Sequence, residues 1–157
     1  MRTVRRRRLE AKTDYKSRLA LLSSGKPRLV IRRTNRYIIA QIVTTTIAQD
    51  SVVAHITSKA LLAKGWPQEY AGGLKNRTAA YLTGFLLGKM VKAKVKEAIL
   101  DIGMLRNVAR SKIYAVVRGT VDAGLNIPHD PTILPTEEMI ENNKKIKSMF
   151  TKIKQNL

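Results

Sequence analysis

The chain has 157 residues, enough for one compact domain, and its 30 lysine and arginine residues against 11 acidic ones give a formal net charge of +19. A field of this sign attracts polyanions: nucleic acid first, an anionic membrane surface second and acidic proteins third. Cysteine is absent, which excludes disulfides, thiolate metal sites and cysteine nucleophiles.

The apolar segments are too short to cross a membrane. Runs such as YLTGFLLGKMV fall well below the roughly 18 to 20 residues that span a bilayer. No apolar segment follows the N-terminal arginines, as one would in a secretory signal. The sequence therefore predicts a cytoplasmic protein without a membrane partner.

Positive charge is concentrated near the N-terminus. Residues 1–36 hold 13 basic and 2 acidic residues, a net charge of +11, whereas residues 37–157 hold 17 and 9, a net charge of +8. An isolated run such as Arg5–Arg8 is at least as typical of a solvated, disordered tail, such as a localisation signal, as of a polyanion contact. Here the run continues into Tyr15, Leu19 and Leu22 at helical spacing. We therefore expect residues 1–27 to form a basic arm that ends in a short helix docked on the body.

Three segments rich in β-branched residues follow the arm. Residues 28–33 and 37–43 are separated by a short turn-like sequence and predict a hairpin, and residues 51–56 complete an antiparallel meander. Side chains alternate along a strand, so Arg28 and Arg32 share one face of the first strand with Val30. Arg32, Arg33 and Arg36 near the turn fit either edge protection against aggregation or a phosphate-binding strip continuous with the arm.

The second half of the chain predicts a helix, a strand and a helix. A long helix begins after Asn76 as N-cap, with Leu82, Phe85, Leu86 and Met90 on its buried stripe. Gly84 and Gly88 in this helix would let it approach the sheet closely. Residues 98–103 are nearly all apolar and predict a strand covered on both faces. A second helix begins around Ser111 and ends at Gly124, which suits a left-handed cap.

These elements define the predicted fold class, which is α/β in the mixed α+β sense. We expect a single domain with a three-stranded antiparallel meander, then helix, strand and helix packed on a mixed sheet. Its parts are the arm at 1–27, the core at 28–134 and a C-terminal amphipathic helix at 135–157. In the core, Trp66 either stacks on a base or fastens a loop to the interior.

The C-terminal segment has its own amphipathic pattern. Its apolar residues recur at helical spacing; they are Met139, Ile146, Phe150, Ile153 and Leu157. This face packs either on its own domain or on a partner.

Catalytic and metal-binding motifs are not supported. The segment GFLLGK has the wrong spacing for a phosphate loop and lies inside a helical pattern. Asp101 follows a buried strand, yet no second acid is paired with it locally, so we interpret it as a structural carboxylate. His55 and His129 lack metal-ligand spacing. We expect no enzyme activity, no cofactor and no metal.

Five segments together resemble a known family. RRRRLEAKTDYKSRL, GKPRLVIRRTNRYIIAQIV, AAYLTGFLLGKM, EAILDIG and VDAGLNIPH occur in this order. They resemble the archaeal and eukaryotic-type branch of the ribosomal large-subunit proteins that bind 5S rRNA, the counterparts of the bacterial L-eighteen protein. The resemblance runs from Arg5 to about Glu138. It implies a small mixed α/β fold, binding to 5S rRNA and attachment of that RNA to large-subunit rRNA in the central protuberance, beside neighbouring ribosomal proteins.

The same resemblance implies a set of RNA-binding residues in the arm and the first hairpin. They are Arg5, Arg6, Arg7, Arg8, Lys12, Tyr15, Lys16, Arg18, Lys26, Arg28, Arg32, Arg33, Asn35 and Arg36. Arginine suits this role because its planar fork binds phosphate oxygens in pairs and stacks on bases. The alternative is a generic basic protein that binds polyanions or a membrane surface. A nuclease built around Asp101 ranks below both.

Overall fold

Four strands form one mixed sheet in the computed structural model, which describes residues 4–47, 49–141 and 150–154. Strands β1 (Arg28–Arg33), β2 (Ile38–Thr46) and β3 (Gln49–Thr57) are the antiparallel meander that the sequence predicts. Strand β4 (Ile99–Asp101) pairs parallel with β1, and the order is β3-β2-β1-β4. The predicted mixed α/β fold is therefore confirmed.

Strand β4 differs from its prediction. It is short and lies at the edge of the sheet, where Ile99 and Leu100 are only half-buried. Leu100 is partly buried against the core, and both Ile99 and Leu100 line the open hollow under the arm helix. An apolar run was therefore not enough to show burial on both faces.

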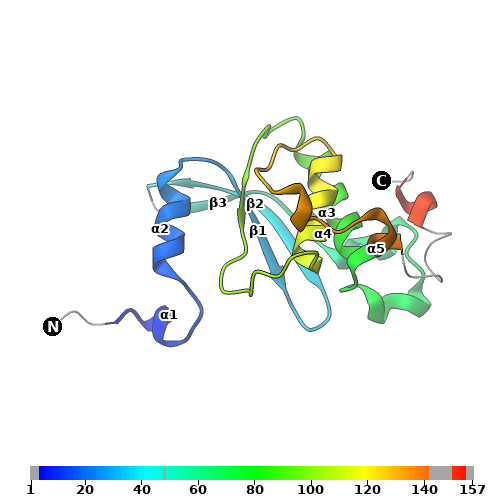
Figure 1. Cartoon of the computed structure of the whole chain (residues 1–157), viewed down its shortest axis with the longest axis horizontal. Coiled ribbons are helices and arrows are strands. Elements are labelled where there is room, and N and C mark those ends of the chain that lie inside the picture. Colours follow the sequence, from blue (N-terminus) through cyan, green and yellow to red (C-terminus); the bar gives the residue numbers. More distant parts are fainter. Residues whose placement is uncertain (1–3, 48, 142–149, 155–157) are drawn as a thin grey trace.

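Two helices, α3 (Arg77–Val91) and α4 (Lys112–Asp122), cover one face of the sheet (Figure 1). The side chain of Asn76 accepts a hydrogen bond from the backbone N–H of Ala79 at 2.7 Å, which confirms the predicted N-cap of α3. Beneath the helices, Leu29 and Ile31 of β1 are 0% and 1% exposed. Alternation along β1 thus sends its aliphatic residues into the core and leaves Arg28 and Arg32 on the opposite face.

The two helices approach each other through glycines. A Cβ at Gly84 would lie on the carbonyl oxygen of Val116, and one at Gly119 would lie on the carbonyl oxygen of Tyr81. Gly88 likewise faces Ala123 of the neighbouring chain segment. The expectation that these glycines bring α3 close to the sheet is wrong, because the close contact is between helices.

The interior contains most of the predicted apolar residues. Trp66 is 2% exposed and its Nε1 donates to the carbonyl of Tyr70 at 3.0 Å, so it fastens the loop between η1 (Ser58–Lys64) and η2 (Gln68–Gly73) to the core. Met90 was predicted to be buried but is 51% exposed. At that end of α3 the inward position belongs to Val91, which is fully buried four residues after Leu87.

The C-terminal segment packs on its own domain. Helix α5 (Glu137–Glu141) buries Ile140, while Met139 is half-buried. Residues 150–154 are also helical and bury Phe150 and Ile153, and the ring of Phe150 lies 5.5 Å from that of Tyr81. The predicted positions Ile146 and Leu157 lie outside the described residues.

The arm forms two helices, α1 (Arg6–Leu9) and α2 (Tyr15–Ser23), at one end of the long axis (Figure 1). A short helix η3 (Pro131–Ile133) precedes α5. Across the described parts of the chain, no helix has the length and apolar character needed to cross a membrane.

The contact between α3 and α4 yields a stability prediction. Gly119→Ala places a methyl group against backbone that cannot move without separating the helices, so we expect the free energy of unfolding to fall by about 3 kcal/mol. The control is Gly72→Ala, because a Cβ at Gly72 meets no atom within 4 Å. Urea unfolding measures both. Equal stability of the two variants would contradict the close contact.

Candidate nucleic-acid interface

The arginine run of the arm is exposed to solvent. Helix α1 has no buried residue, and Arg5–Arg8 are all exposed. The Nε of Arg7 donates to Thr13 Oγ1 at 3.0 Å, and Glu10 contacts both Arg6, at 3.5 Å, and Lys12, at 2.8 Å. One carboxylate cannot neutralise so many cations, so most of the charge of the arm is available to an external anion.

A capping carboxylate fixes the start of α2. Oδ1 of Asp14 accepts the backbone N–H groups of Lys16 and Ser17 at 3.0 and 3.3 Å, and Oδ2 accepts the hydroxyl of Ser17 at 2.8 Å. These hydrogen bonds, led by that of the Ser17 hydroxyl, lower the pKa of Asp14 below its ordinary value of 3.8. The cap thus remains charged and directs the chain from α1 into α2.

Tyr15 supports the arginine run within the free protein. The guanidinium carbon of Arg5 lies 4.5 Å from the centre of the Tyr15 ring, in cation–π geometry. Leu19, which was expected to pack on the body with Tyr15, is 70% exposed, so that expectation is wrong. Helix α2 has no buried residue. An ion pair between Arg18 of α2 and Asp50 of β3 holds the helix on the sheet, where an apolar face was expected to do so.

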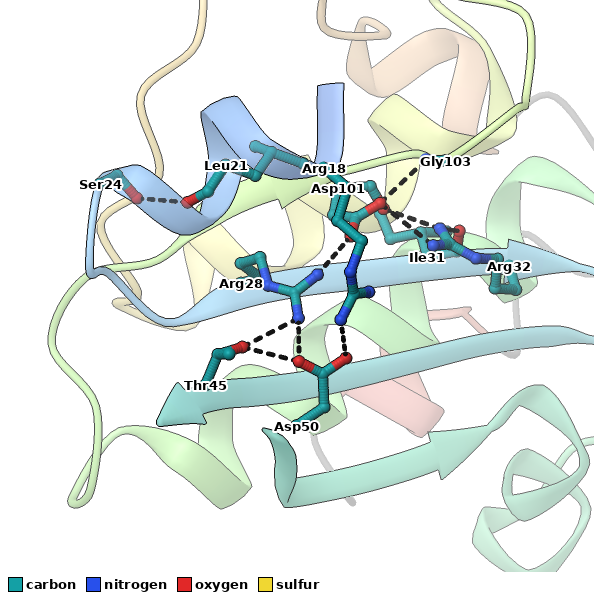
Figure 2. Close-up of polar contacts among 10 residues, drawn as sticks. All are labelled: Arg18, Leu21, Ser24, Arg28, Ile31, Arg32, Thr45, Asp50, Asp101 and Gly103. Atoms are coloured by element: carbon teal, nitrogen blue, oxygen red, sulfur yellow. Dashed lines mark hydrogen bonds and ion pairs between the residues drawn. The ribbon is translucent and has the colours of Figure 1, made fainter. Parts of the chain in front are cut away.

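The ion pair between Arg18 and Asp50 belongs to a network centred on Arg28, whose side chain is 2% exposed. Nη1 of Arg28 lies 2.8 Å from Oδ2 of Asp101, and Nη2 lies 2.7 Å from Oδ1 of Asp50. Nη2 also donates to Thr45 Oγ1 at 3.1 Å. Figure 2 shows these side chains meeting over the face of the sheet that α3 and α4 leave uncovered. Arg28, a predicted RNA contact, therefore points inward.

Each aspartate bridges two arginines. Asp50 also accepts Nη2 of Arg18 at 2.9 Å, which ties α2 to β3, and Asp101 accepts Nη2 of Arg32 at 3.1 Å (Figure 2). The backbone N–H of Gly103 donates to the same Asp101 carboxylate at 2.9 Å. The network therefore joins α2 to all the strands of the sheet.

The environment of Asp50 keeps it ionised. Partial burial raises its pKa, but the hydrogen bonds from Thr45, Arg18 and Arg28 outweigh this effect and hold the pKa below its ordinary value of 3.8. A depressed carboxylate pKa means that this contact stabilises the fold above pH 3.8 and is lost as the pH falls through the lowered value. At neutral pH, α2 is held by a charged carboxylate.

An open hollow of about 640 Å³ lies between α2 and β4. Among the residues that line it are Arg7 and Lys12 from the arm, Arg18 from α2 and Arg32 from β1. The Arg32 side chain remains 42% exposed despite its bond to Asp101. The fold thus brings basic residues from the arm and the sheet to one surface.

The other predicted site residues are more dispersed. Lys16 is exposed on α2, and Nζ of Lys26 lies 3.0 Å from Glu97 in an exposed ion pair. Asn35 and Arg36 are exposed in the turn between β1 and β2. Arg33 belongs to the opposite face of β1, together with Leu29 and Ile31, and lies apart from the hollow under α2.

A second basic group was missed by the sequence reasoning. It surrounds the N-terminal ends of α3 and α4 together with Arg33, and its other members are Lys75, Arg77, Arg106, Arg110 and Lys112. The sequence did carry a signal for this group, namely Arg77 and Lys112 at the first positions of α3 and α4. Cations there oppose the helix dipole and are therefore unusual.

Asp101 has the structural role that the sequence predicted. It is 5% exposed, and its contacts are with arginines and with the backbone of Gly103. Within the described ranges, no group of three or more histidine, cysteine, aspartate or glutamate residues is placed to hold a metal ion.

Comparison with known proteins finds ribosomal large-subunit proteins throughout. Residues 1–98 and 91–130 match the family model described as ribosomal large subunit proteins 60S L5, and 50S L18. The large ribosomal subunit protein uL18 of Korarchaeum cryptofilum is 53% identical over 86% of this chain and 68% of its own length. The uL18 protein of Methanothermobacter thermautotrophicus is 45% identical over 86% of this chain and 69% of its own length. That of Caldivirga maquilingensis is 43% identical over 96% of this chain and 71% of its own length.

A basic arm on a mixed sheet, matched over most of its length by these relatives, defines a ribosomal protein of the large subunit. The chain belongs to the family of ribosomal large-subunit proteins 60S L5 and 50S L18. The resemblance seen in the sequence is confirmed. Members of this family are structural components of the cytoplasmic ribosome and are not enzymes.

The buried network gives a second stability prediction. Asp101→Asn keeps the side-chain shape but leaves Arg28 with one buried charge contact fewer, so we expect a loss of roughly 3 kcal/mol in the free energy of unfolding. Glu97→Gln is the matched control. It removes an equal charge from a pair whose side chains are 46% and 50% exposed, and its effect should stay below about 1 kcal/mol. Denaturant unfolding in which both variants behave alike would disprove the structural role of Asp101.

Proposed function

We propose that this chain binds 5S rRNA and attaches it to large-subunit rRNA in the central protuberance. The observation that carries the proposal is the exposed arginine run Arg5–Arg8 at one end of the molecule (Figure 1), whose Arg7 lines the same hollow as Arg18 of α2 and Arg32 of β1. Family membership supports a role in the large ribosomal subunit. The proposal goes beyond family membership in naming the RNA, which is 5S rRNA, and the place of attachment, which is the central protuberance.

The proposed RNA surface consists of exposed and half-buried basic and polar residues of the arm, the hollow and the first turn. They are Arg5, Arg6, Arg7, Arg8, Lys12, Lys16, Arg18, Lys26, Arg32, Asn35 and Arg36. Phosphate contacts from these residues would fix the position of the RNA, while Tyr15 could exchange its contact with Arg5 for stacking on an unpaired base. Arg28 is assigned a positioning role because its guanidinium is buried.

The arm and the sheet would act together. An arginine run on a free tail would bind any polyanion, whereas arginines held at fixed positions by Asp14, Tyr15 and Asp50 can match the spacing of phosphates on one folded RNA. Preorganisation of this kind favours a specific RNA over bulk RNA. Isolation of the native protein with a discrete 5S species supports the proposal, and bulk RNA of all sizes would reduce the function to general polyanion binding.

The salt dependence of binding tests the arm directly. Each phosphate contact contributes about −0.7 to −0.9 to the log–log slope of affinity against salt. Replacing Arg5–Arg8 with alanine should therefore flatten the slope for 5S rRNA by roughly 2 to 3 if most of these arginines contact phosphate. The measurement is filter binding over a range of salt concentrations.

The control for this experiment carries the same charge change outside the arm. Lys59, Lys64, Lys92 and Lys94 are all exposed, and their replacement by alanine should leave most of the slope intact. If both variants flatten the slope equally, binding responds to net charge alone and the arm has no special role.

A further inference from the structure

A second basic hollow lies on the side of β1 opposite the arm. It has a volume of about 720 Å³ and is bordered by the N-terminal ends of α3 and α4. Its basic lining comes from Arg33 at the end of β1, Arg77 at the start of α3, and Arg110 and Lys112 at the start of α4. Three segments distant in sequence thus direct cations to one opening.

An adjoining hollow extends this surface. It has a volume of about 270 Å³, shares Arg33 and Lys112 with the first hollow, and adds Arg106 from the loop after β4. Among the described residues, none that is acidic lines either hollow, and none forms an ion pair with these basic side chains. In contrast, the hollow under α2 is lined by Asp14 and Asp101 as well as by arginines.

The charges at this site are unfavourable for the isolated protein. Arg77 and Lys112 are the first residues of α3 and α4, where the helix dipole is positive, and neither helix has an acidic residue in its first turn. Burial lowers the pKa of Lys112, and repulsion from Lys75, Arg33 and Arg77 lowers it further. An anion in the hollow would relieve both the mutual repulsion and the conflict with the dipoles.

Hydrogen-bond donors are also available there. Ser111 lies at the N-cap of α4 without making a side-chain cap, and its buried Oγ has no partner among the described residues. The first N–H groups of any α-helix lack intrahelical acceptors. A phosphate oxygen at this position could accept from these donors and from the arginine forks at once.

We propose that this hollow binds backbone phosphates of a second RNA strand, separate from the RNA that the arm binds. The inference deepens the proposed function and rests on it, because a protein that joins two RNAs needs two surfaces. Alternation along β1 puts Arg32 on the arm side and Arg33 on the side of the hollow, so a single strand cannot lie against both flat faces. Arginine predominates at the site, and its fork matches phosphate oxygens in pairs.

The test uses the full chain and three substitutions at the hollow, Arg77→Gln, Arg110→Asn and Lys112→Gln. Asparagine is chosen at position 110 because the φ of Arg110 is +57°, a conformation that asparagine tolerates. The control variant carries Lys59→Gln, Lys64→Gln and Lys94→Gln, an equal change of charge at exposed positions elsewhere. Melting temperatures establish that both variants are folded. If the triple variant unfolds, Arg33→Gln with Arg106→Gln replaces it.

Each protein is first saturated with 5S rRNA and then titrated with a labelled RNA duplex of about 20 base pairs and unrelated sequence. We expect the parent and control complexes to capture the duplex and the hollow variant to bind it at least about tenfold more weakly. The affinity for 5S rRNA should change by less than about threefold in the hollow variant.

Three results would overturn the proposal. The hollow and control variants could capture the duplex equally well. The hollow variant could lose as much affinity for 5S rRNA as for the duplex, or polyglutamate at equal charge could displace the duplex. The last would indicate an acidic protein as the partner. If the parent fails to bind 5S rRNA, the proposed function fails, but titration of the free proteins with the duplex still tests the hollow.

Discussion

The buried guanidinium of Arg28 constrains the arrangement of the sheet and the arm. A charge that is 2% exposed must keep its partners, because an unpaired buried ion is very unfavourable. Its partners come from distant parts of the chain: Asp50 from β3 and Asp101 from the end of β4. The pairing therefore fixes β4 beside β1 and brings the start of β3 within reach of Arg18, which positions α2.

The two faces of strand β1 make different contacts. Its aliphatic residues anchor α3 and α4, while its arginines on the opposite face support the arm through the two aspartates. The strand ends in Arg33, which returns positive charge to the side of the helices. The large excess of charge is therefore divided between two surfaces, which suits the proposed role of a protein held between RNA segments.

Local patterns in the sequence were enough to predict most of the fold. Period-two segments identified the meander, Asn76 marked the start of α3, and Gly124, with its φ of +102°, marked the end of α4. Predictions failed where the outcome depended on contacts distant in sequence. Leu19 is exposed because a salt bridge spanning 32 positions, between Arg18 and Asp50, docks α2 in place of an apolar face.

The candidate site was predicted less completely. The exposed arginines of the arm could be found from charge density alone, but nothing local distinguishes the buried Arg28 from the half-exposed Arg32 four residues later. Local patterns do not indicate the second basic hollow, because its residues come from three segments and converge only after α3 and α4 pack together. Only the unusual cations at the helix N-termini could have indicated it.

The ion pairs of Asp50 hold in place the arm that we propose binds RNA, and the affinity of Asp50→Asn for 5S rRNA tests this role most directly. This substitution removes a negative charge, so net charge alone would strengthen RNA binding. Loss of the bridge between Arg18 and Arg28 should instead release α2 and weaken binding by roughly tenfold, the equivalent of one charge-assisted hydrogen bond. Glu69→Gln changes the charge equally at an exposed position in η2 and should bind at least as tightly as the parent. Binding by Asp50→Asn that equals or exceeds that of Glu69→Gln would contradict the account.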